Sequence, residues 1–387
     1  MVSSGRRSSS GRQVLVIDGA VPDPLFGFGF PRMFEIVQSL VRGGHAVSVY
    51  AMASTSQERR RMDRLCAGRV RFHRSAGAAG LRALLDGSDF DLVIVSRPEP
   101  MRAFAGATWT PAGAPPLVAY DLEAVTTPRE ARRRLLYGED WSREDEAAAL
   151  AAEIEVARGA DAVVAVTTAD EALVASLLPL PSFVLSHPVQ VRPSAAPFAG
   201  RDGFLFVGRM TGSAVTFPNV DAVRWFVDQV VPQIDARMGV DYRIHLVGLH
   251  DEEAAQLASD RVILHGAVDD LDQFYERCRV FVAPTRYAAG VPIKVIEAIG
   301  KGVPCVTTPL LAQQVGAEGH GFTSTFSAEA FAEACVRLYT DPVAWESARD
   351  YGLLYAQQCF SQDTFDATVE RLVECAVLHR TGAGRDR

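Results

Sequence analysis

Residues 283–307 read APTRYAAGVPIKVIEAIGKGVPCVT, and the pattern of this stretch decides the fold. It begins at the end of an apolar run, passes through a glycine-containing loop at 288–292, and takes on the apolar spacing of a helix from Ile293. A second short apolar run follows at 304–307. A strand, a loop, a helix and another strand in this order predict one unit of a parallel, doubly wound sheet.

The same alternation covers most of the chain. Short apolar runs that predict buried strands lie at 14–17, 46–50, 91–95, 116–120, 161–166, 203–208, 242–247, 262–264 and 280–283. A proline-bearing stretch interrupts the pattern near the middle. We therefore predict an α/β fold with two Rossmann-like doubly wound domains facing a cleft. The expected parts are a disordered tail at 1–11, an N-terminal domain at 12–186, a linker at 187–201, a C-terminal domain at 202–360, and a last helix at 361–387 that packs back on the N-terminal domain.

The composition is that of a globular chain. Of the 387 residues, 48% are hydrophobic and 22% are charged, with a formal net charge of -8. Because the chain is acidic, it suits no broad nucleic-acid surface, and any anion site must be local. The sequence has no apolar run long enough to span a membrane and no signal-peptide pattern. The six cysteines lack metal-ligand spacing, so we expect reduced thiols and a cytoplasmic protein.

Two charged residues lie at the start of the helix in the deciding stretch. Lys294 and Glu297 are three residues apart and share one helix face. The free amides of the helix start, the glycine loop and the positive charge of Lys294 together suit a diphosphate. Glu297, about one turn further along, suits the two hydroxyls of a ribose. The alternative is a solvated Lys–Glu pair on a surface helix.

This stretch resembles the Glu-x7-Glu region of group 1 (family 4) glycosyltransferases of the GT-B fold, and similar segments lie along nearly the whole chain. They are 14–18 with the Gly29 loop and Arg32 and Met33, 43–47, 203–209, 218–226, 266–271 and 288–298. The resemblance implies a bacterial enzyme of the GT-B fold. Its N-terminal domain would bind the acceptor, and its C-terminal domain would bind the nucleotide-sugar donor.

The resemblance also implies roles for single residues. Arg209 and Lys294 would be the catalytic residues that neutralise the leaving diphosphate, and Glu297 would hold the ribose. The backbone of Gly29 would approach the phosphates from the N-terminal domain, and Val268 would read the nucleobase. The other donor-binding candidates are Ala289, Gly290, Val291 and Pro292.

Two departures from the family pattern concern the donor sugar. Ala289 stands where the first Glu of the motif would touch the sugar, and the Lys that follows the family's Gly-Arg is absent from 210–218. The implied reaction moves a sugar from a UDP-sugar or GDP-sugar to a small-molecule or glycan acceptor, with retention. It needs no metal and no other cofactor, and we interpret Asp269 and Asp270 as a helix start rather than a metal site.

Candidates for acceptor contacts lie where the N-terminal strands end. They are Asp18, Arg97, Glu99, Asp121 and Glu123. Each also has a structural interpretation. Asp18 can cap a loop, Arg97 and Glu99 can close a turn, and Asp121 can cap a helix and pair with Arg129 or Arg132.

Other functions remain open at this point. A dehydrogenase is disfavoured because the first loop lacks Gly-x-Gly-x-x-Gly. An epimerase or phosphorylase of the same architecture and a non-catalytic nucleotide-binding module stay as alternatives. The expected partners are a nucleotide sugar and a small-molecule acceptor, in natural-product or cell-surface sugar assembly, with no nucleic acid. The sequence leaves open the nucleobase, the sugar, the attacking atom and whether the chain forms a homodimer.

Overall fold

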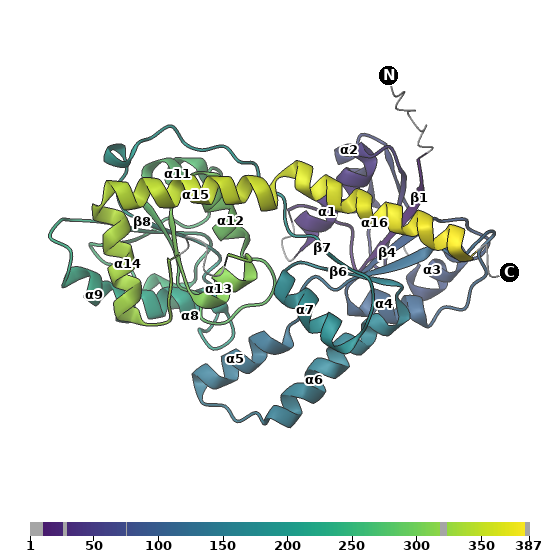
Figure 1. Ribbon diagram of the computed structural model, residues 1–387, viewed down its shortest axis with the longest axis horizontal. Helices are drawn as coiled ribbons and strands as arrows, with labels where there is room; N and C mark the ends of the chain where they lie inside the picture. The colour runs from purple at the N-terminus through teal and green to yellow at the C-terminus, as the bar shows by residue number, and fades with distance from the viewer. Residues whose placement is uncertain (1–10, 26–28, 75, 318–322, 384–387) are drawn as a thin grey trace, which may run out of the picture.

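The computed structural model describes residues 11–25, 29–74, 76–317 and 323–383, and Figure 1 shows two α/β halves side by side. Each half has a parallel sheet, so the predicted fold class is confirmed. Apart from Gly11, the predicted disordered tail lies outside the described residues. None of the helices in the described ranges is long and apolar enough to cross a membrane.

The N-terminal sheet has seven strands in the order β3-β2-β1-β4-β5-β6-β7. The strands are β1 Gln13–Asp18, β2 Ala46–Ala51, β3 Val70–Phe72, β4 Leu92–Ser96, β5 Leu117–Asp121, β6 Ala162–Ala165 and β7 Ser182–Val184. The helices of this half are α1 Phe30–Arg42, α2 Ser56–Leu65, α3 Gly77–Leu85, α4 Pro98–Ala105, α5 Thr127–Tyr137, α6 Arg143–Glu155 and α7 Thr168–Leu177. The order reverses between β1 and β4, which is where doubly wound sheets bind ligands.

The C-terminal sheet has six strands in the order β10-β9-β8-β11-β12-β13. The strands are β8 Phe204–Val207, β9 Ile244–Val247, β10 Val262–Leu264, β11 Val280–Ala283, β12 Cys305–Thr307 and β13 Thr323–Ser324. The helices are α8 Pro218–Trp225, α9 Val231–Asp235, α10 Glu252–Ala255, α11 Asp272–Arg277, α12 Ile293–Gly300, α13 Pro309–Gln314, α14 Ala328–Thr340, α15 Pro342–Phe360 and α16 Gln362–Ala383. A π-helical segment, Phe226–Val230, joins α8 to α9.

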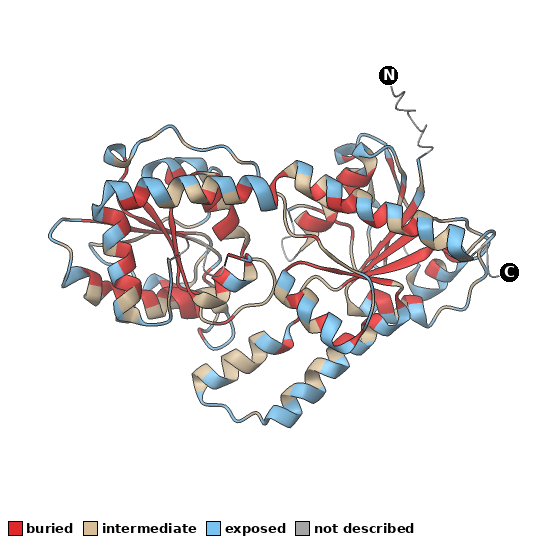
Figure 2. Ribbon diagram, in the orientation of Figure 1, coloured by how far each residue is buried: buried red, intermediate tan, exposed pale blue. Residues whose placement is uncertain are grey.

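The central strands of both sheets are buried on their two faces, as the red strands in Figure 2 show. Strand β1 illustrates the cause, because successive side chains point to opposite faces. Val14 and Val16 belong to the core on the α1 side, whereas Leu15 and Ile17 belong to the core on the opposite side. An uninterrupted apolar run is therefore what a central parallel strand requires.

The chain crosses between the halves twice, once after β7 and once between α15 and α16 (Figure 1). Helix α16 lies against α1, and Val369 and Leu372 join the core of the N-terminal half. Arg42 in α1 donates two hydrogen bonds to Asp366 in α16, at 2.9 and 2.7 Å. The last helix thus completes the N-terminal half, although the C-terminal half separates the two in sequence.

Candidate functional site

Lys294 lies in the first turn of α12, directly after the loop at 288–292. Its Nζ donates a hydrogen bond to Asn219 Oδ1 at 2.6 Å and lies 4.3 Å from the centre of the Phe206 ring. Burial lowers the pKa of Lys294 to about 7. Because this partner is a neutral amide rather than a carboxylate, the ammonium keeps its charge uncompensated. A half-buried cation without a countercharge favours the approach of an anion.

Asn219 is the functional residue that the sequence analysis did not single out. It is the second residue of α8, and its Nδ2 donates to the backbone carbonyl of Arg209 at 3.0 Å. The side-chain amide of Asn219 therefore links Arg209, which follows β8, to the Lys294 ammonium on α12. The available signal was the polar residue next to Pro218 at the start of an otherwise apolar helix face.

The backbone carbonyl of Arg209 and the ammonium of Lys294 both bond to the Asn219 amide. The guanidinium of Arg209 is exposed, and its Nε donates to Thr211 Oγ1 at 2.9 Å. Among the described residues no carboxylate pairs with this guanidinium, so it can take an anionic partner. The convergence of Arg209 and Lys294 on one diphosphate stays a prediction from the sequence.

Glu297 lies on the next turn of α12 and is half-buried. Burial raises its pKa above the usual range, and the Tyr275 hydroxyl donates to its Oε2 at 3.5 Å. Val268, the predicted nucleobase reader, is half-buried and packs on the core cluster that also contains Tyr275. Val268 thus lies near the strand ends of the half that carries Lys294 and Glu297.

The loop of Ala289, Gly290, Val291 and Pro292 reaches the N-terminal half. Gly290 has a φ of 73°, and a Cβ placed on it would lie 3.2 Å from the Ala124 Cβ and 3.8 Å from Val166 Cγ2. A glycine is needed for both the left-handed backbone and the close approach. The donor-side loop and the ends of β5 and β6 therefore face each other directly.

Helix α5 makes a second contact between the halves. Tyr137 Oη donates to Asp221 Oδ1 in α8 at 2.7 Å, and Asp221 also accepts hydrogen bonds from Arg286. Arg132 donates from Nε to the backbone carbonyl of Arg286 at 3.3 Å. Arg129 and Arg132 both donate to backbone carbonyls of the C-terminal half. The predicted pairing of Asp121 with one of these arginines is therefore wrong.

Asp121 pairs with Arg32 instead, and both side chains are almost fully buried, with 0% and 1% of their surface exposed. Arg32 donates to the two oxygens of Asp121 at 2.9 and 2.7 Å and from Nε to the Leu185 carbonyl at 2.8 Å. Ser96 Oγ adds a hydrogen bond to Asp121 at 3.2 Å. Asp121 thus ties the ends of β4, β5 and β7 to α1.

Arg97 links two further acidic candidates. Its Nε lies 3.0 Å from Asp18 Oδ1, and its Nη2 donates to Glu123 Oε1 at 3.0 Å. Burial raises the pKa of Asp18 and of Glu123 to about 7, against the opposing effect of Arg97. Arg97 and Glu123 have positive φ angles of 77° and 57°. Such strain costs about 1–3 kcal/mol per residue and tends to occur at functional sites.

Glu123 also fills the space beside Gly29. Gly29 precedes α1 with a φ of 83°, and a Cβ on it would lie 2.1 Å from Glu123 Oε1. A carboxylate thus lies directly against Gly29, on the side where a Cβ would stand. The approach of the Gly29 backbone to a phosphate stays a prediction from the sequence.

An open groove of about 630 Å³ runs along the strand ends of the N-terminal half. Gly19, Arg97 and the exposed Glu99 line it, together with Thr127 and Glu153 from the α5–α6 pair. Asp18 and Asp121 are both fully buried. Of the acceptor-side candidates, Arg97 and Glu99 therefore face a space that can hold a ligand.

The sequence and the fold were compared with known proteins. Residues 201–341 match the family model described as glycosyl transferases group 1. The search of curated proteins found no match. HepE from Anabaena, in complex with UDP and glucose, is 14% identical, with a TM-score of 0.66 over 94% of this chain and 100% of HepE. Sucrose-phosphate synthase from Thermosynechococcus elongatus is 14% identical, with a TM-score of 0.68 over 95% and 100% of the two chains.

A glycosyltransferase from Rickettsia africae is similar in the same way. It is 12% identical and has a TM-score of 0.66 over 95% of this chain and 99% of its own. At such identities the structural likeness establishes the fold, and the family match over 201–341 adds the evidence from sequence. On these two grounds the chain has the GT-B fold of these solved structures, and residues 201–341 resemble the group 1 glycosyl transferases.

Proposed function

We propose that the protein transfers a sugar from a nucleoside diphosphate sugar to a small-molecule or glycan acceptor, with retention and without a metal ion. The observation that carries this proposal is the half-buried ammonium of Lys294, at the start of α12, which bonds to the neutral amide of Asn219. It lies beside a glycine loop that faces the N-terminal half. The similar HepE structure contains UDP and glucose, which supports a uridine nucleotide as the first donor to test.

The proposed chemistry follows from where charge develops. As the bond from C1 to the diphosphate oxygen breaks, negative charge grows on that oxygen, and Lys294 and Arg209 stabilise it more than they stabilise the intact donor. The acceptor heteroatom forms its bond to C1 on the same face, and its proton passes to the departing phosphate. The cations of the chain supply the neutralisation, and Glu297 holds the ribose hydroxyls.

The acceptor side of the proposal uses the open groove of the N-terminal half. Arg97 and Glu99 line that groove. Glu123 accepts a hydrogen bond from Arg97 and lies beside Gly29. We propose these three as acceptor-side residues. Asp18 and Asp121 are assigned structural roles because both are fully buried. The cytoplasmic setting, the natural-product role and the bacterial origin stay predictions from the sequence.

The pKa of Lys294 predicts how nucleotide binding depends on pH. Because this pKa lies at about 7 in the free protein, the ammonium loses its proton above pH 7, while a bound diphosphate favours the protonated form. The Kd for UDP is therefore expected to rise from about pH 7 to about pH 9, by at most about tenfold per pH unit. In Lys294→Arg the guanidinium stays charged, and the dependence should vanish. Calorimetric titration across this range would contradict the assignment if both proteins gave equal slopes.

Glu297→Ala is expected to weaken nucleotide binding while leaving kcat within a few-fold of its original value. Loss of hydrogen bonds to a charged group is worth about 1.5–3 kcal/mol, so the Kd for UDP should rise about 10–100-fold. The measurement is a calorimetric titration with UDP. Glu333→Ala, which removes an exposed carboxylate on α14, is the matched control. An unchanged Kd in Glu297→Ala would remove Glu297 from the site.

The proposed function is tested by a thermal-shift screen with UDP, GDP and their sugars, followed by single-turnover assays with the best donor. Binding to the native state raises Tm by mass action. Donor consumption that depends on an acceptor supports a transferase. Formation of an epimer, or of a sugar phosphate from inorganic phosphate, would favour the epimerase or the phosphorylase. Binding without turnover across an acceptor panel would indicate a binding module.

A further inference from the structure

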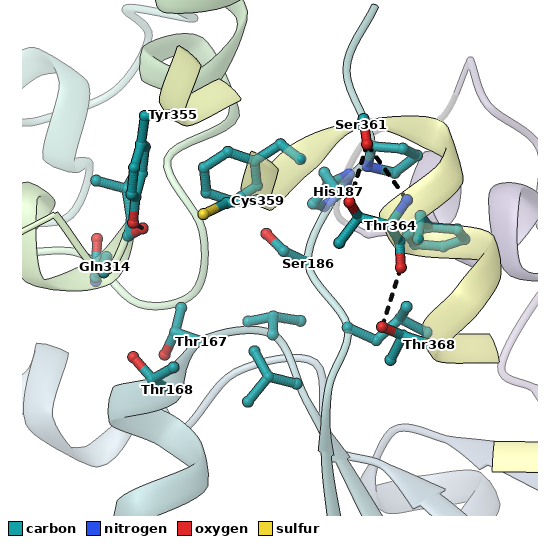
Figure 3. A pocket seen from close by; sticks show the side chains of 18 residues that line it. Thr167, Thr168, Ser186, His187, Gln314, Tyr355, Cys359, Ser361, Thr364 and Thr368 are labelled. Carbon is teal, nitrogen blue, oxygen red and sulfur yellow. Dashed lines mark hydrogen bonds between the residues drawn. The ribbon is translucent and has the colours of Figure 1, made fainter. Parts of the chain in front are cut away.

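A cavity of about 200 Å³ lies where the chain crosses between the two halves (Figure 3). We call it the crossover cavity. Its walls are residues 166–168 after β6, 184–188 from the end of β7, 314–316 from the end of α13, and the α15–α16 junction. Val189 N donates to the Phe360 carbonyl at 2.8 Å, so the two crossings are hydrogen-bonded to each other at its edge. One water needs a volume of about 10–15 Å³, so the cavity is large enough for a small organic molecule.

Two polar atoms in this wall lack a partner. Ser186 Oγ and Gln314 Oε1 are buried and have no hydrogen-bond partner among the described residues. Figure 3 shows the Ser186 side chain directed into the cavity from the first crossing. Gln314 is held in place because its Nε2 donates to the Ala288 carbonyl at 3.2 Å. Buried polar groups are nearly always satisfied, so the pair points to an occupant that can both donate and accept.

The rest of the wall is neutral. No Asp, Glu, Lys or Arg is among the described residues that line the cavity, and burial, with the nearby Arg32, lowers the pKa of His187 to about 3. Apolar side chains make up much of the surface, among them Leu185, Val315 and Phe360. An ion would lose its hydration here without gaining a countercharge. The wall thus selects against charged ligands.

We propose that the crossover cavity binds a neutral, hydroxyl-bearing ring compound, such as a cyclic polyol or a monosaccharide, at a second site whose lining includes none of the proposed donor residues. A compound with several hydroxyls can accept a hydrogen bond from Ser186 with one of them and donate to Gln314 with another. The apolar face of the ring packs on Leu185 and Phe360. Because both halves form the wall, the ligand favours the arrangement of halves in which these surfaces meet.

The test is equilibrium binding of myo-inositol and glucose to the full chain by calorimetry, with sulfate as the charged comparison probe. We expect saturable binding of at least one neutral probe and none of sulfate. Ser186→Ala should weaken that binding about 3–10-fold, the scale of one hydrogen bond. Ser176→Ala, which removes an exposed serine hydroxyl on α7, is the matched control and should leave the Kd unchanged.

Cys359 gives an independent readout because it lines the cavity and is exposed, whereas Cys375 is half-buried outside it. Bound polyol should slow alkylation of Cys359, measured by mass spectrometry, and leave Cys375 unaffected. The absence of saturable binding by both neutral probes, or equal binding by Ser186→Ala and the unchanged protein, would overturn the proposal and leave water as the occupant. Neither readout depends on glycosyl transfer.

Discussion

Replacing Lys294 by alanine is expected to lower kcat/KM about 10²–10³-fold, the scale for losing one preorganised contact to charge that develops in the transition state. The ammonium is half-buried and bonded to a neutral amide, so water screens its field less than it would at an exposed site. Because the stabilisation grows as the diphosphate departs, kcat should fall as well as the affinity for the donor.

Lys301→Ala is the matched control, since it removes the only other lysine of the chain, at the far end of the same helix. Lys301 Nζ pairs with the exposed Asp272 at 2.5 Å, and a surface pair of this kind contributes at most about 1 kcal/mol to stability. Initial rates with a nucleotide sugar at low concentration give kcat/KM for both variants. Intact turnover in Lys294→Ala, with circular dichroism showing an unchanged fold, would mean that the diphosphate binds elsewhere.

Asp121→Ala is expected to lower the free energy of unfolding by about 3–5 kcal/mol, the cost of leaving a buried charge without its partner. The guanidinium of Arg32 would remain buried, and of its present acceptors only the Leu185 carbonyl, which bonds to Nε, would be left. The same substitution releases the ends of β4 and β5 from α1. Urea unfolding followed by circular dichroism measures the loss as a change in midpoint at constant slope.

The control for this prediction removes both charges. Arg32→Met combined with Asp121→Leu should recover most of the lost stability, because apolar residues of similar volume commonly replace a buried pair at little cost. The two single substitutions and the double form one thermodynamic cycle. A loss below about 1 kcal/mol in Asp121→Ala would show that the pair does not hold these strand ends together.

The sequence predicted the features that depend on local pattern. The apolar run of β1 was recognisable because a central parallel strand is apolar on both faces, and the helix start at Ile293 followed from a glycine loop and regular apolar spacing. Lys294 and Glu297 were placed on one face by spacing alone. Strands β3 and β13 were not predicted, because β3 has a central arginine and β13 has only two residues.

Features that depend on distant contacts escaped prediction. Arg32 and Asp121 are 89 residues apart, so nothing local distinguishes this pair from an N-cap with a nearby arginine. The contact of Glu123 with Gly29 likewise exists only after the sheet has formed. Helix α5 has only Thr127 fully buried, and its polar sequence gave no sign that Tyr137 and Arg132 bond to the C-terminal half.

The most direct test is a crystal structure of the chain with UDP. The account predicts that the diphosphate lies within hydrogen-bonding distance of Lys294 Nζ and the Arg209 guanidinium, with the ribose hydroxyls on Glu297. It also predicts that Glu123 has moved away from Gly29 if the phosphates reach that backbone. UDP bound away from α12, with Lys294 still bonded only to Asn219, would contradict the account.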